Sequence, residues 1–592
     1  MKPLRGVFLV MIFSLILFFP ANSQAAIGDL RVSYLEGDVQ VKTADSSDWV
    51  PASMNMPLLD GDAVWVPDGS RAAVQLREGT VVRLDENSSL EILSLGDDTF
   101  QFYLSLGHAY VNFRGRRGIL LQMDSPASST RAFGKAKFGV DVADNGFTDV
   151  SVFKGSVSTE GGNGRIKVTA GDILSIGGDT YAELAPLGPA DEWERWNREM
   201  DERMDRRYAS STYLPSELSS YSADFEDNGR WVSTSEYGYV WTPTMVAVDW
   251  APYRLGRWTW IGGEYVWVSY DPWGWTPYHY GRWAYIASIG WCWVPPVRGD
   301  VYWGPGYVGW VNTGSYLAWV PLAPGEIYYG HGQYGRYSVN ITNININTIN
   351  VSNVYKNVYV TNGITVVSKD AFISGRPSHV DASVITGIKE NNFLVRKIEV
   401  GRPQIAPTKA SYLPVVKSIA ASKEPPQAIR QIQVSKLKEN RPIVKNPSQS
   451  VMKPGVSLNP MTVTTLKEPK RPGAGLQAPG LQPKKTGREI KQPGGVTQER
   501  EIKMPGGAMP ESEVKRPVEK AAPEVKKPVE KAVPEVKRPI EKAMPEVKRP
   551  VEKATPEVKK PAGEAVKQGS QPKIQQKGKE SEQEQTGGQN VK

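Results

Sequence analysis

Aromatic side chains that could stack on a ligand gather in one stretch of the chain. Of the 18 Trp residues, 14 lie between Trp231 and Trp319. In a strand such as 257–260, alternate side chains point to the same face, so Trp258 and Trp260 share a face. A row of such rings suits the apolar face of a sugar, while neighbouring Arg and Asp groups can bond its hydroxyl groups.

The repeated motifs supply candidates for both roles. Ring-stacking candidates are Trp258, Trp260, Trp283, Tyr253 and Tyr278, and candidates for polar contacts are Arg257, Arg282, Asp249 and Asp271. The alternative is structural, because rings that each bury about 150–250 Å² can themselves form the core of small units. The sequence leaves sugar binding and core packing both open.

Other chemistry has weaker support. His108, His279, His331 and His379 show no metal-ligand spacing. The segments 304–309 and 330–335 match a dinucleotide-binding pattern as text, but neither leads from a strand into a helix, so we interpret both as Gly-rich loops. We expect no catalytic, metal or cofactor site and no enzyme, with a glycan-active carboxylate pair as the alternative.

The aromatic motifs recur along the chain and imply repeated β units. Trp250-Ala251-Pro252-Tyr253 and Gly256-Arg257-Trp258 return 25 positions later as Trp275-Thr276-Pro277-Tyr278 and Gly281-Arg282-Trp283. One such unit cannot bury its own face, so we expect the units to stack as a β repeat module over 221–336. This stretch resembles a Trp/Tyr-rich domain of unknown function that often follows FecR-type domains in bacterial exported proteins.

The N-terminal end predicts export. Residues 1–26 combine a basic start, an apolar run and a small-residue end around Ser23-Gln24-Ala25, as in a signal peptide. The alternative is an uncleaved anchor, but the apolar run of 6–19 is shorter than the roughly 20 residues that span a bilayer. We therefore expect a periplasmic, cell-surface or secreted protein without a transmembrane span after cleavage. The single Cys292 cannot form an internal disulfide, and we interpret it as a small buried side chain.

Residues 27–187 show short alternating runs between turn signals, as in an all-β domain. The motifs that carry a resemblance are Gly37-Asp38-Val39, Trp49-Val50-Pro51, Leu59-Asp60-Gly61-Asp62-Ala63-Val64, Ser70-Arg71-Ala72-Ala73-Val74, Gly79-Thr80-Val81-Val82-Arg83-Leu84, Val150-Ser151-Val152-Phe153-Lys154-Gly155-Ser156-Val157 and Ala170-Gly171-Asp172. Together they resemble a FecR-type domain. The resemblance implies a compact β structure of the bacterial envelope, whose best-known examples pass a signal to a sigma factor.

Two features depart from the FecR pattern. The FecR-like part follows a signal peptide rather than a cytoplasmic segment and a membrane helix. The segment 134–140 also differs from the usual Gly-Thr-x-Phe-x-Val strand. The resemblance therefore implies the fold more firmly than the signalling role.

One helix is predicted between the two β regions. In a connector over 188–220, Trp193, Trp196, Met200 and Met204 lie on one face of a helix spanning 189–208. An apolar stripe with this spacing is typical of a docking face.

The remainder of the chain differs in composition. Residues 337–400 include an Asn-rich run that fits either a stacked β coil or an extended strand. Residues 401–592 contain one aromatic residue, carry a net charge of +18 and repeat an 11-residue Pro-Glu-Val-Lys pattern over 512–561. We expect a disordered, extended tail there, because too little apolar surface is available to offset ordering. Residues 1–400 sum to −10, so contact between tail and body competes with any external partner.

The sequence as a whole predicts a mainly β, non-enzymatic envelope protein that binds or scaffolds peptidoglycan, another anionic envelope polymer or an envelope protein. The alternative is a FecR-type regulatory partner in transmembrane signalling, and a second alternative is a glycan-active enzyme. We expect no nucleic-acid partner.

Overall fold

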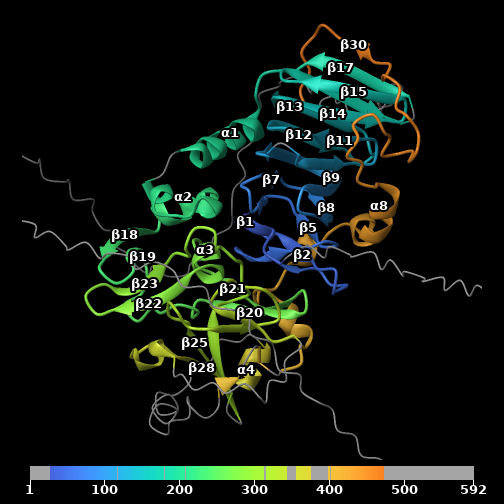
Figure 1. Ribbon diagram of the computed structural model, residues 1–592. Coiled ribbons are helices and arrows are strands. Elements are labelled where there is room, and N and C mark those ends of the chain that lie inside the picture. Colours follow the sequence, from blue (N-terminus) through green and yellow to red (C-terminus); the bar gives the residue numbers. More distant parts are fainter. Residues whose placement is uncertain are drawn as a thin grey trace, which may run out of the picture. The chain divides into compact units, whose positions relative to one another are not determined.

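The computed structural model describes residues 27–116, 118–178, 180–206, 209–312, 315–342, 355–374, 398–399, 402–403 and 405–472 (Figure 1). Chain contacts divide the protein into two units, 1–487 and 488–592, and all described residues lie in the first. This unit is mainly β, as predicted. Across the described residues, no helix combines the length and apolar character needed to cross a membrane.

The N-terminal β domain, residues 27–187, consists of seventeen strands. They are β1 (Leu30–Glu36), β2 (Gln40–Lys42), β3 (Val50–Pro51), β4 (Pro57–Leu58), β5 (Ala63–Val66), β6 (Arg71–Leu76), β7 (Val81–Leu84), β8 (Ser88–Leu95), β9 (Thr99–Phe113), β10 (Leu120–Asp124), β11 (Ser129–Ala132), β12 (Ala136–Val142), β13 (Thr148–Lys154), β14 (Ser156–Gly161), β15 (Gly164–Thr169), β16 (Asp172–Gly177) and β17 (Tyr181–Pro186). Most neighbouring strands pair antiparallel, whereas β9 and β10 pair in parallel.

The long strand β9 joins two parts of this sheet system. Its first half pairs with β8 and β10, and its second half, from Gly107 onward, pairs with β7 and β12. Gly107 has a φ of +88°, a conformation that favours glycine, where the partners change. Inward-facing aliphatic residues from both parts, such as Ile92 and Val140, share one buried core. The alternation seen in the sequence therefore marks the face of each strand that packs inward.

The predicted connector helix is α1 (Glu192–Asp205), which docks on the N-terminal β domain. Asp191 caps it by accepting a hydrogen bond from the Glu194 backbone N–H. The predicted apolar stripe is only half-buried, and the buried centre of the face is polar. There Asp201 and Arg83, each 2% exposed, form an ion pair of 2.8 Å. The docking prediction identified the face but missed its polar centre.

The Trp/Tyr module, residues 221–336, contains four β hairpins. Their strands are β18 (Gly229–Thr234) with β19 (Gly238–Pro243), β20 (Gly256–Ile261) with β21 (Glu264–Ser269), β22 (Arg282–Ile286) with β23 (Gly290–Val294), and β24 (Val308–Asn312) with β25 (Tyr316–Pro321). Each hairpin places two Trp residues directly opposite each other: Trp231 and Trp241, Trp258 and Trp267, Trp283 and Trp293, and Trp310 and Trp319. The sequence repeat thus corresponds to a Trp-paired hairpin.

The Gly of the Gly-Arg-Trp motif has a packing role. A Cβ on Gly256 would lie 2.6 Å from Cζ2 of Trp267, and a Cβ on Gly281 would lie 2.8 Å from Nε1 of Trp293. In the first three hairpins the second indole therefore covers the glycine at or just before the start of the first strand. Glycine is needed because any side chain would displace that ring.

Short elements complete the described structure. Those around the module are the 3₁₀ helices η1 (Ala209–Thr212), η2 (Ser216–Tyr221) and η4 (Lys356–Tyr359), the helices α2 (Ser222–Glu226), α3 (Trp275–His279) and α4 (Lys369–Ser374), and the strands β26 (Tyr328–Gly330), β27 (Ser338–Asn340), β28 (Thr365–Ser368) and β29 (Ile398–Glu399). The Asn-rich run over 343–354 lies outside the described residues, as do the signal peptide and the 11-residue repeats. Cys292 is buried in β23, as predicted.

The prediction of a disordered tail from residue 401 is wrong for residues 405–472, which we call the strap. The strap packs along the N-terminal β domain and contains η5 (Lys409–Tyr412), η6 (Ala421–Lys423), α7 (Gln427–Arg430), α8 (Val434–Asn440) and β30 (Thr464–Thr465) (Figure 1). β30 extends the sheet by pairing in parallel with β17. The low apolar content was misleading because the strap gains order from the domain beneath it rather than from a core of its own.

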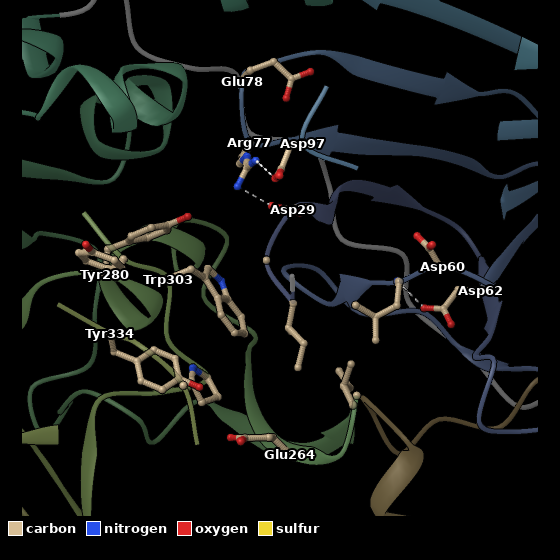
Figure 2. Close-up of a pocket in the computed structure, with 18 of the residues that line it drawn as sticks. Asp29, Asp60, Asp62, Arg77, Glu78, Asp97, Glu264, Tyr280, Trp303 and Tyr334 are labelled. Carbon is tan, nitrogen blue, oxygen red and sulfur yellow. Dashed lines mark hydrogen bonds and ion pairs between the residues drawn. The ribbon is translucent and has the colours of Figure 1, made fainter. Parts of the chain in front are cut away.

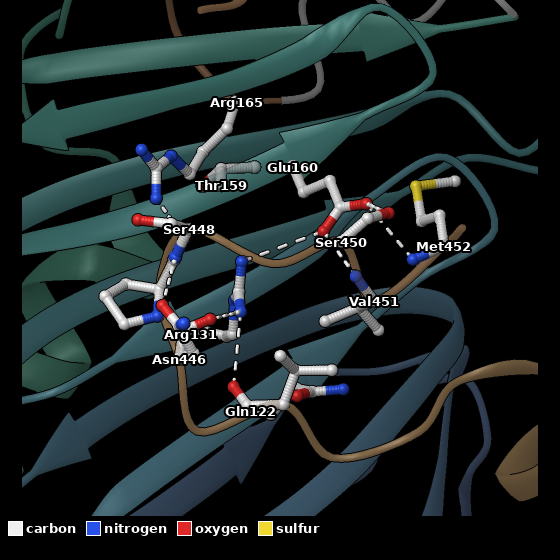
Figure 3. Close-up of polar contacts among 12 residues, drawn as sticks. Gln122, Arg131, Thr159, Glu160, Arg165, Asn446, Ser448, Ser450, Val451 and Met452 are labelled. Carbon is white, nitrogen blue, oxygen red and sulfur yellow. Dashed lines mark hydrogen bonds and ion pairs between the residues drawn. The ribbon is translucent and has the colours of Figure 1, made fainter. Parts of the chain in front are cut away.

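Polar contacts fix the strap at a buried carboxylate (Figure 3). The Glu160 side chain accepts hydrogen bonds from the Ser450 hydroxyl and from the Val451 and Met452 backbone N–H groups, at 2.5–3.1 Å. The buried Arg131 donates to backbone carbonyls on the other limb of this turn, at Val444 and Asn446. The bonds involve mostly main-chain groups of the strap.

Charge complementarity also holds the strap. Six strap lysines pair with carboxylates of the N-terminal β domain: Lys409 with Asp48, Lys417 with Asp38, Lys423 with Asp68, Lys438 with Asp60, Lys445 with Asp98 and Lys470 with Glu183. The expected attraction between the basic tail and the acidic body is therefore confirmed for this segment. Exposed pairs each contribute only about 0–1 kcal/mol, so their combined pattern matters more than any one pair.

Candidate functional site

Most of the rings predicted to stack on a ligand are inside the module. Tyr253 and Tyr278 are 0% exposed, Trp283 is 1% exposed and Trp258 is 3% exposed. Their neighbours are other rings, so no ring face is left for a sugar. The structure thus places these four rings in the core, which was the alternative interpretation, because each hairpin turns its Trp pair inward.

The buried rings are also hydrogen-bonded. The Tyr253 hydroxyl donates to the Tyr278 carbonyl at 2.7 Å, and the Tyr278 hydroxyl donates to Asp271 at 2.8 Å. Burial raises the pKa of Asp271 to about 6, although the Tyr278 hydrogen bond opposes the shift. Tyr253 adopts a left-handed backbone conformation, with φ at +60°, which this packing holds in place. Asp271 therefore acts as a core acceptor and not as a surface contact.

The other three residues predicted to make polar contacts do not form one binding surface. Arg257 is buried and donates to the Ala410 carbonyl of the strap, and burial lowers its pKa. The Arg282 guanidinium lies 3.9 Å from the centre of the Tyr307 ring. Asp249 is exposed. Among the nine predicted site residues, only Trp260 lines the cleft described next.

A cleft of about 1100 Å³ lies between the N-terminal β domain and the Trp/Tyr module. Figure 2 shows its two walls: Tyr280, Trp303 and Tyr334 come from the module on one side, and carboxylates including Asp29 and Asp97 come from the β domain on the other. Trp260 and Glu264, from the hairpin of β20 and β21, also line it. One wall is thus mainly aromatic and the other mainly acidic.

The aromatic wall is held rigidly. The Trp303 ring stacks on the buried His279 ring, with centroids 4.8 Å apart and planes at 15°. His279 bonds the Gly304 carbonyl at 2.7 Å, and burial lowers its pKa to about 4, so this ring is neutral at pH 7. The Trp303 indole nitrogen is buried and has no hydrogen-bond partner among the described residues. The cleft therefore presents the Trp303 ring in a fixed position, with its indole nitrogen turned away from solvent.

Carboxylates exceed cations on the acidic wall and at the rim. The cleft is lined by eight Asp and Glu side chains and by two Arg side chains. The Arg77 guanidinium forms ion pairs with two of the carboxylates, at 2.9 Å from Asp29 and 3.6 Å from Asp97. Burial raises the pKa of Asp62 to about 7, and it also raises the pKa of Glu264 and of Asp60. In all three carboxylates, burial outweighs the hydrogen bonds and the nearby cations that favour the charged form.

Sequence reasoning missed the cleft because its walls are far apart in the chain. The Asp60-Gly61-Asp62 segment, quoted above for the FecR resemblance, forms a turn in which Asp62 accepts hydrogen bonds from the Leu59 and Ala44 backbone N–H groups. The two Gly-rich segments are loops over 304–307 and 331–335, as predicted, whereas Val308 and Gly309 begin β24 and Gly330 ends β26. Residues near or within these loops line the cleft, including Trp303 and Tyr334. The usable signal was the excess of aromatic residues in these loops.

Comparison with known families identifies both β regions. Residues 62–158 match the family described as FecR protein, and residues 222–326 match a family of unknown function, DUF6600. No curated protein matches this chain.

Two solved structures have similar parts, both crystal structures of a putative anti-sigma factor from Parabacteroides distasonis ATCC 8503. The first is 21% identical with a TM-score of 0.19, over 21% of this chain and 57% of that chain. The second is 16% identical with a TM-score of 0.20, over 31% of this chain and 98% of that chain. This chain thus spans little more than half the length of the first. From the family matches, the chain carries a FecR domain followed by a domain of a family whose function is unknown.

Proposed function

We propose that this protein is a non-enzymatic regulatory protein of the FecR type, which acts by binding a partner outside the cytoplasm. The observation that carries the proposal is that the FecR match lies within the N-terminal β domain, which supplies the acidic wall of the cleft and also holds the strap. A domain that binds an extended segment of its own chain and shares a cleft with a second domain is suited to sensing a partner.

We propose export because residues 1–26 have the pattern of a signal peptide. Fractionation of the native host with an antibody against the chain tests this part. The expected result is a periplasmic or extracellular protein whose first residue lies near position 26. A full-length cytoplasmic protein would contradict export.

The regulatory role is tested by comparing transcripts of a deletion strain with those of the parent. We expect a defined set of transcripts to change and to return to normal on complementation with the wild-type gene or with Asp249→Asn, which alters an exposed residue outside the cleft. Trp260→Ala, which alters the cleft, should not restore them. An unchanged transcript profile, together with retention of the protein on purified peptidoglycan, would instead support the envelope-scaffold function.

A further inference from the structure

We infer that the cleft between the N-terminal β domain and the Trp/Tyr module binds an extended peptide segment that bears Lys or Arg side chains. The inference deepens the proposed function and rests on it for biological meaning, because it names the chemistry of the partner. Its physical basis is independent and lies in the two walls of the cleft.

The first argument is the charge of the acidic wall. Eight carboxylates and two guanidinium groups line the cleft. Lys438 offsets Asp60, Arg402 offsets Glu264, and burial raises the pKa of Asp62 to about 7, but the lining still carries an excess of negative charge. A cleft with an excess of one sign focuses its field and raises the local concentration of ligands of the opposite sign. A cationic ligand would also supply counter-charge to carboxylates such as Glu264 and Asp97, whereas an anionic polymer would be repelled.

The second argument is the aromatic wall. Indole and phenol rings attract cations through the negative charge on their faces, and Trp is the strongest of them. The chain itself shows this contact at the rim: the Arg402 guanidinium lies 4.9 Å from the centre of the Trp260 ring and donates to the Gly263 carbonyl. The same hairpin supplies Glu264, whose pKa is lowered by Arg402 but raised more by burial. A cation on Trp260 is therefore an observed contact.

The third argument is the way the N-terminal β domain already binds polypeptide. It holds the strap through six Lys–carboxylate pairs, and one of these, Lys438 with Asp60 at 3.3 Å, joins the strap to a residue that lines the cleft. The strap is mostly extended and contributes mainly backbone groups around Glu160. A second extended chain with spaced cations would meet the same chemistry in the cleft.

Size favours a peptide over a single small cation. Small-molecule sites typically measure about 300–1000 Å³, and this cleft, at about 1100 Å³, has room for several residues of an extended chain. Tyr280, Trp303 and Tyr334 form the wall against which the side chains of such a segment would pack.

The test is fluorescence anisotropy with the full chain and a labelled 12-residue peptide of alternating Lys, Pro and Val. We expect saturable binding that weakens at least tenfold between about 50 and 300 mM salt, because the contacts are ionic. A peptide with Glu in place of each Lys should not bind. No binding of the Lys peptide would overturn the inference, as would equal binding of the two peptides.

Variants locate the binding. Trp260→Ala and Glu264→Gln should each weaken peptide binding at least tenfold, whereas Asp249→Asn should change it less than twofold. Because Trp260 packs on Tyr265, Asp97→Asn serves as a second variant that cannot disturb the core, since the Asp97 side chain is 99% exposed. Equal binding by wild type, Glu264→Gln and Asp97→Asn would place the peptide elsewhere and overturn the inference.

Two competitors separate other ligands from a peptide. Spermidine carries the same ammonium groups without a backbone, and a chitin tetrasaccharide carries hydroxyl groups without charge. Displacement of the peptide only at concentrations at least a hundredfold above its own supports a peptide site. Displacement by spermidine at equal concentration, or by the tetrasaccharide, would overturn it. If peptide binding holds while the deletion strain shows no transcript change, the regulatory proposal fails and the binding site stands.

Discussion

The core of the N-terminal β domain consists mostly of Val, Leu and Ile, whereas the core of the Trp/Tyr module consists mostly of Trp and Tyr. An aliphatic side chain contributes only packing. A ring contributes packing and a polar edge. In the module, three such edges donate to backbone carbonyls of the segments around the hairpins: Trp241 to Phe225, Trp283 to Pro277 and Trp293 to Tyr280. The difference shows how short hairpins joined by long loops can be fixed without disulfides, because rings such as these three both fill the core and anchor a neighbouring segment.

The first way to test this contrast is to remove one ring. Trp283→Ala should lower the free energy of unfolding by about 4 kcal/mol, because it leaves a large cavity and frees the Pro277 carbonyl. Trp283→Phe, which keeps most of the ring but not the donor, should cost less. Leu104→Ala in the other core should cost about 3 kcal/mol. Urea unfolding measures all three, and a smaller loss for Trp283→Ala than for Leu104→Ala would contradict the contrast.

The second test concerns the polar contacts between α1 and the N-terminal β domain. Asp201→Ala should cost about 3 kcal/mol, because it leaves the buried Arg83 without its counter-charge. Burial favours the neutral form of Asp201, but Arg83, Lys137 and Asn112 outweigh burial and lower its pKa. Asp205→Ala lies one turn further along α1 and breaks an exposed pair with Arg114, so it should cost less than about 1 kcal/mol. Equal losses in the two variants would show that Arg83 finds another partner.

The third test uses the Glu91 carboxyl, which is buried in the N-terminal β domain between two serine hydroxyls. Burial raises the pKa of Glu91 from its ordinary value of 4.5 to about 7, and the Ser105 and Ser89 hydroxyls offset this only in part. Between these two pKa values, the folded chain keeps the Glu91 proton that the unfolded chain has lost. The stability contributed by Glu91 is therefore complete below pH 4.5 and lost as the pH rises through about 7, by roughly 2–3 kcal/mol.

Glu91→Gln removes this pH dependence. Between about pH 4.5 and 7.5, the variant should lose roughly 2–3 kcal/mol less stability than the wild type, as measured by urea unfolding at several pH values. Glu199→Gln, at an exposed position of α1, should follow the wild type. Parallel curves for wild type and Glu91→Gln would show that Glu91 is ionised in the folded protein.

The fourth test has the smallest expected effect and concerns the glycine that the second Trp of a hairpin covers. Gly256→Ala should cost about 2 kcal/mol, because the new methyl group would collide with the Trp267 ring and with the Val268 carbonyl. Gly290→Ala, in the turn of another hairpin, has open space around the Cβ position and should cost only about 1 kcal/mol for its φ of +94°. Thermal unfolding distinguishes them, and a reversed order would mean that backbone strain outweighs ring contact.

The two regions also differ in how far the sequence predicts them. Alternation in β7, β9 and β13 predicts the strands and the inward face of the N-terminal β domain, because an aliphatic residue is informative about burial. A Trp such as Trp258 fits either a core or a binding surface, and only the cross-strand pairing with Trp267 shows which one applies. The cleft and the strap were not predictable because they depend on contacts between residues hundreds of positions apart, such as Lys438 and Asp60.

The strap has a consequence for when the protein can finish folding. β30 pairs with β17 across about 280 residues, with Thr464 opposite Glu183, and the buried Glu160 receives its hydrogen bonds from Ser450 to Met452. Until residue 472 has been synthesised, this edge of the sheet and this carboxylate lack their partners, so the first domain in the chain is among the last to be completed. Such long-range pairing slows folding. The edge of β17 and the Glu160 carboxylate therefore stay without their final partners until late in synthesis, after the rest of the N-terminal β domain has been made.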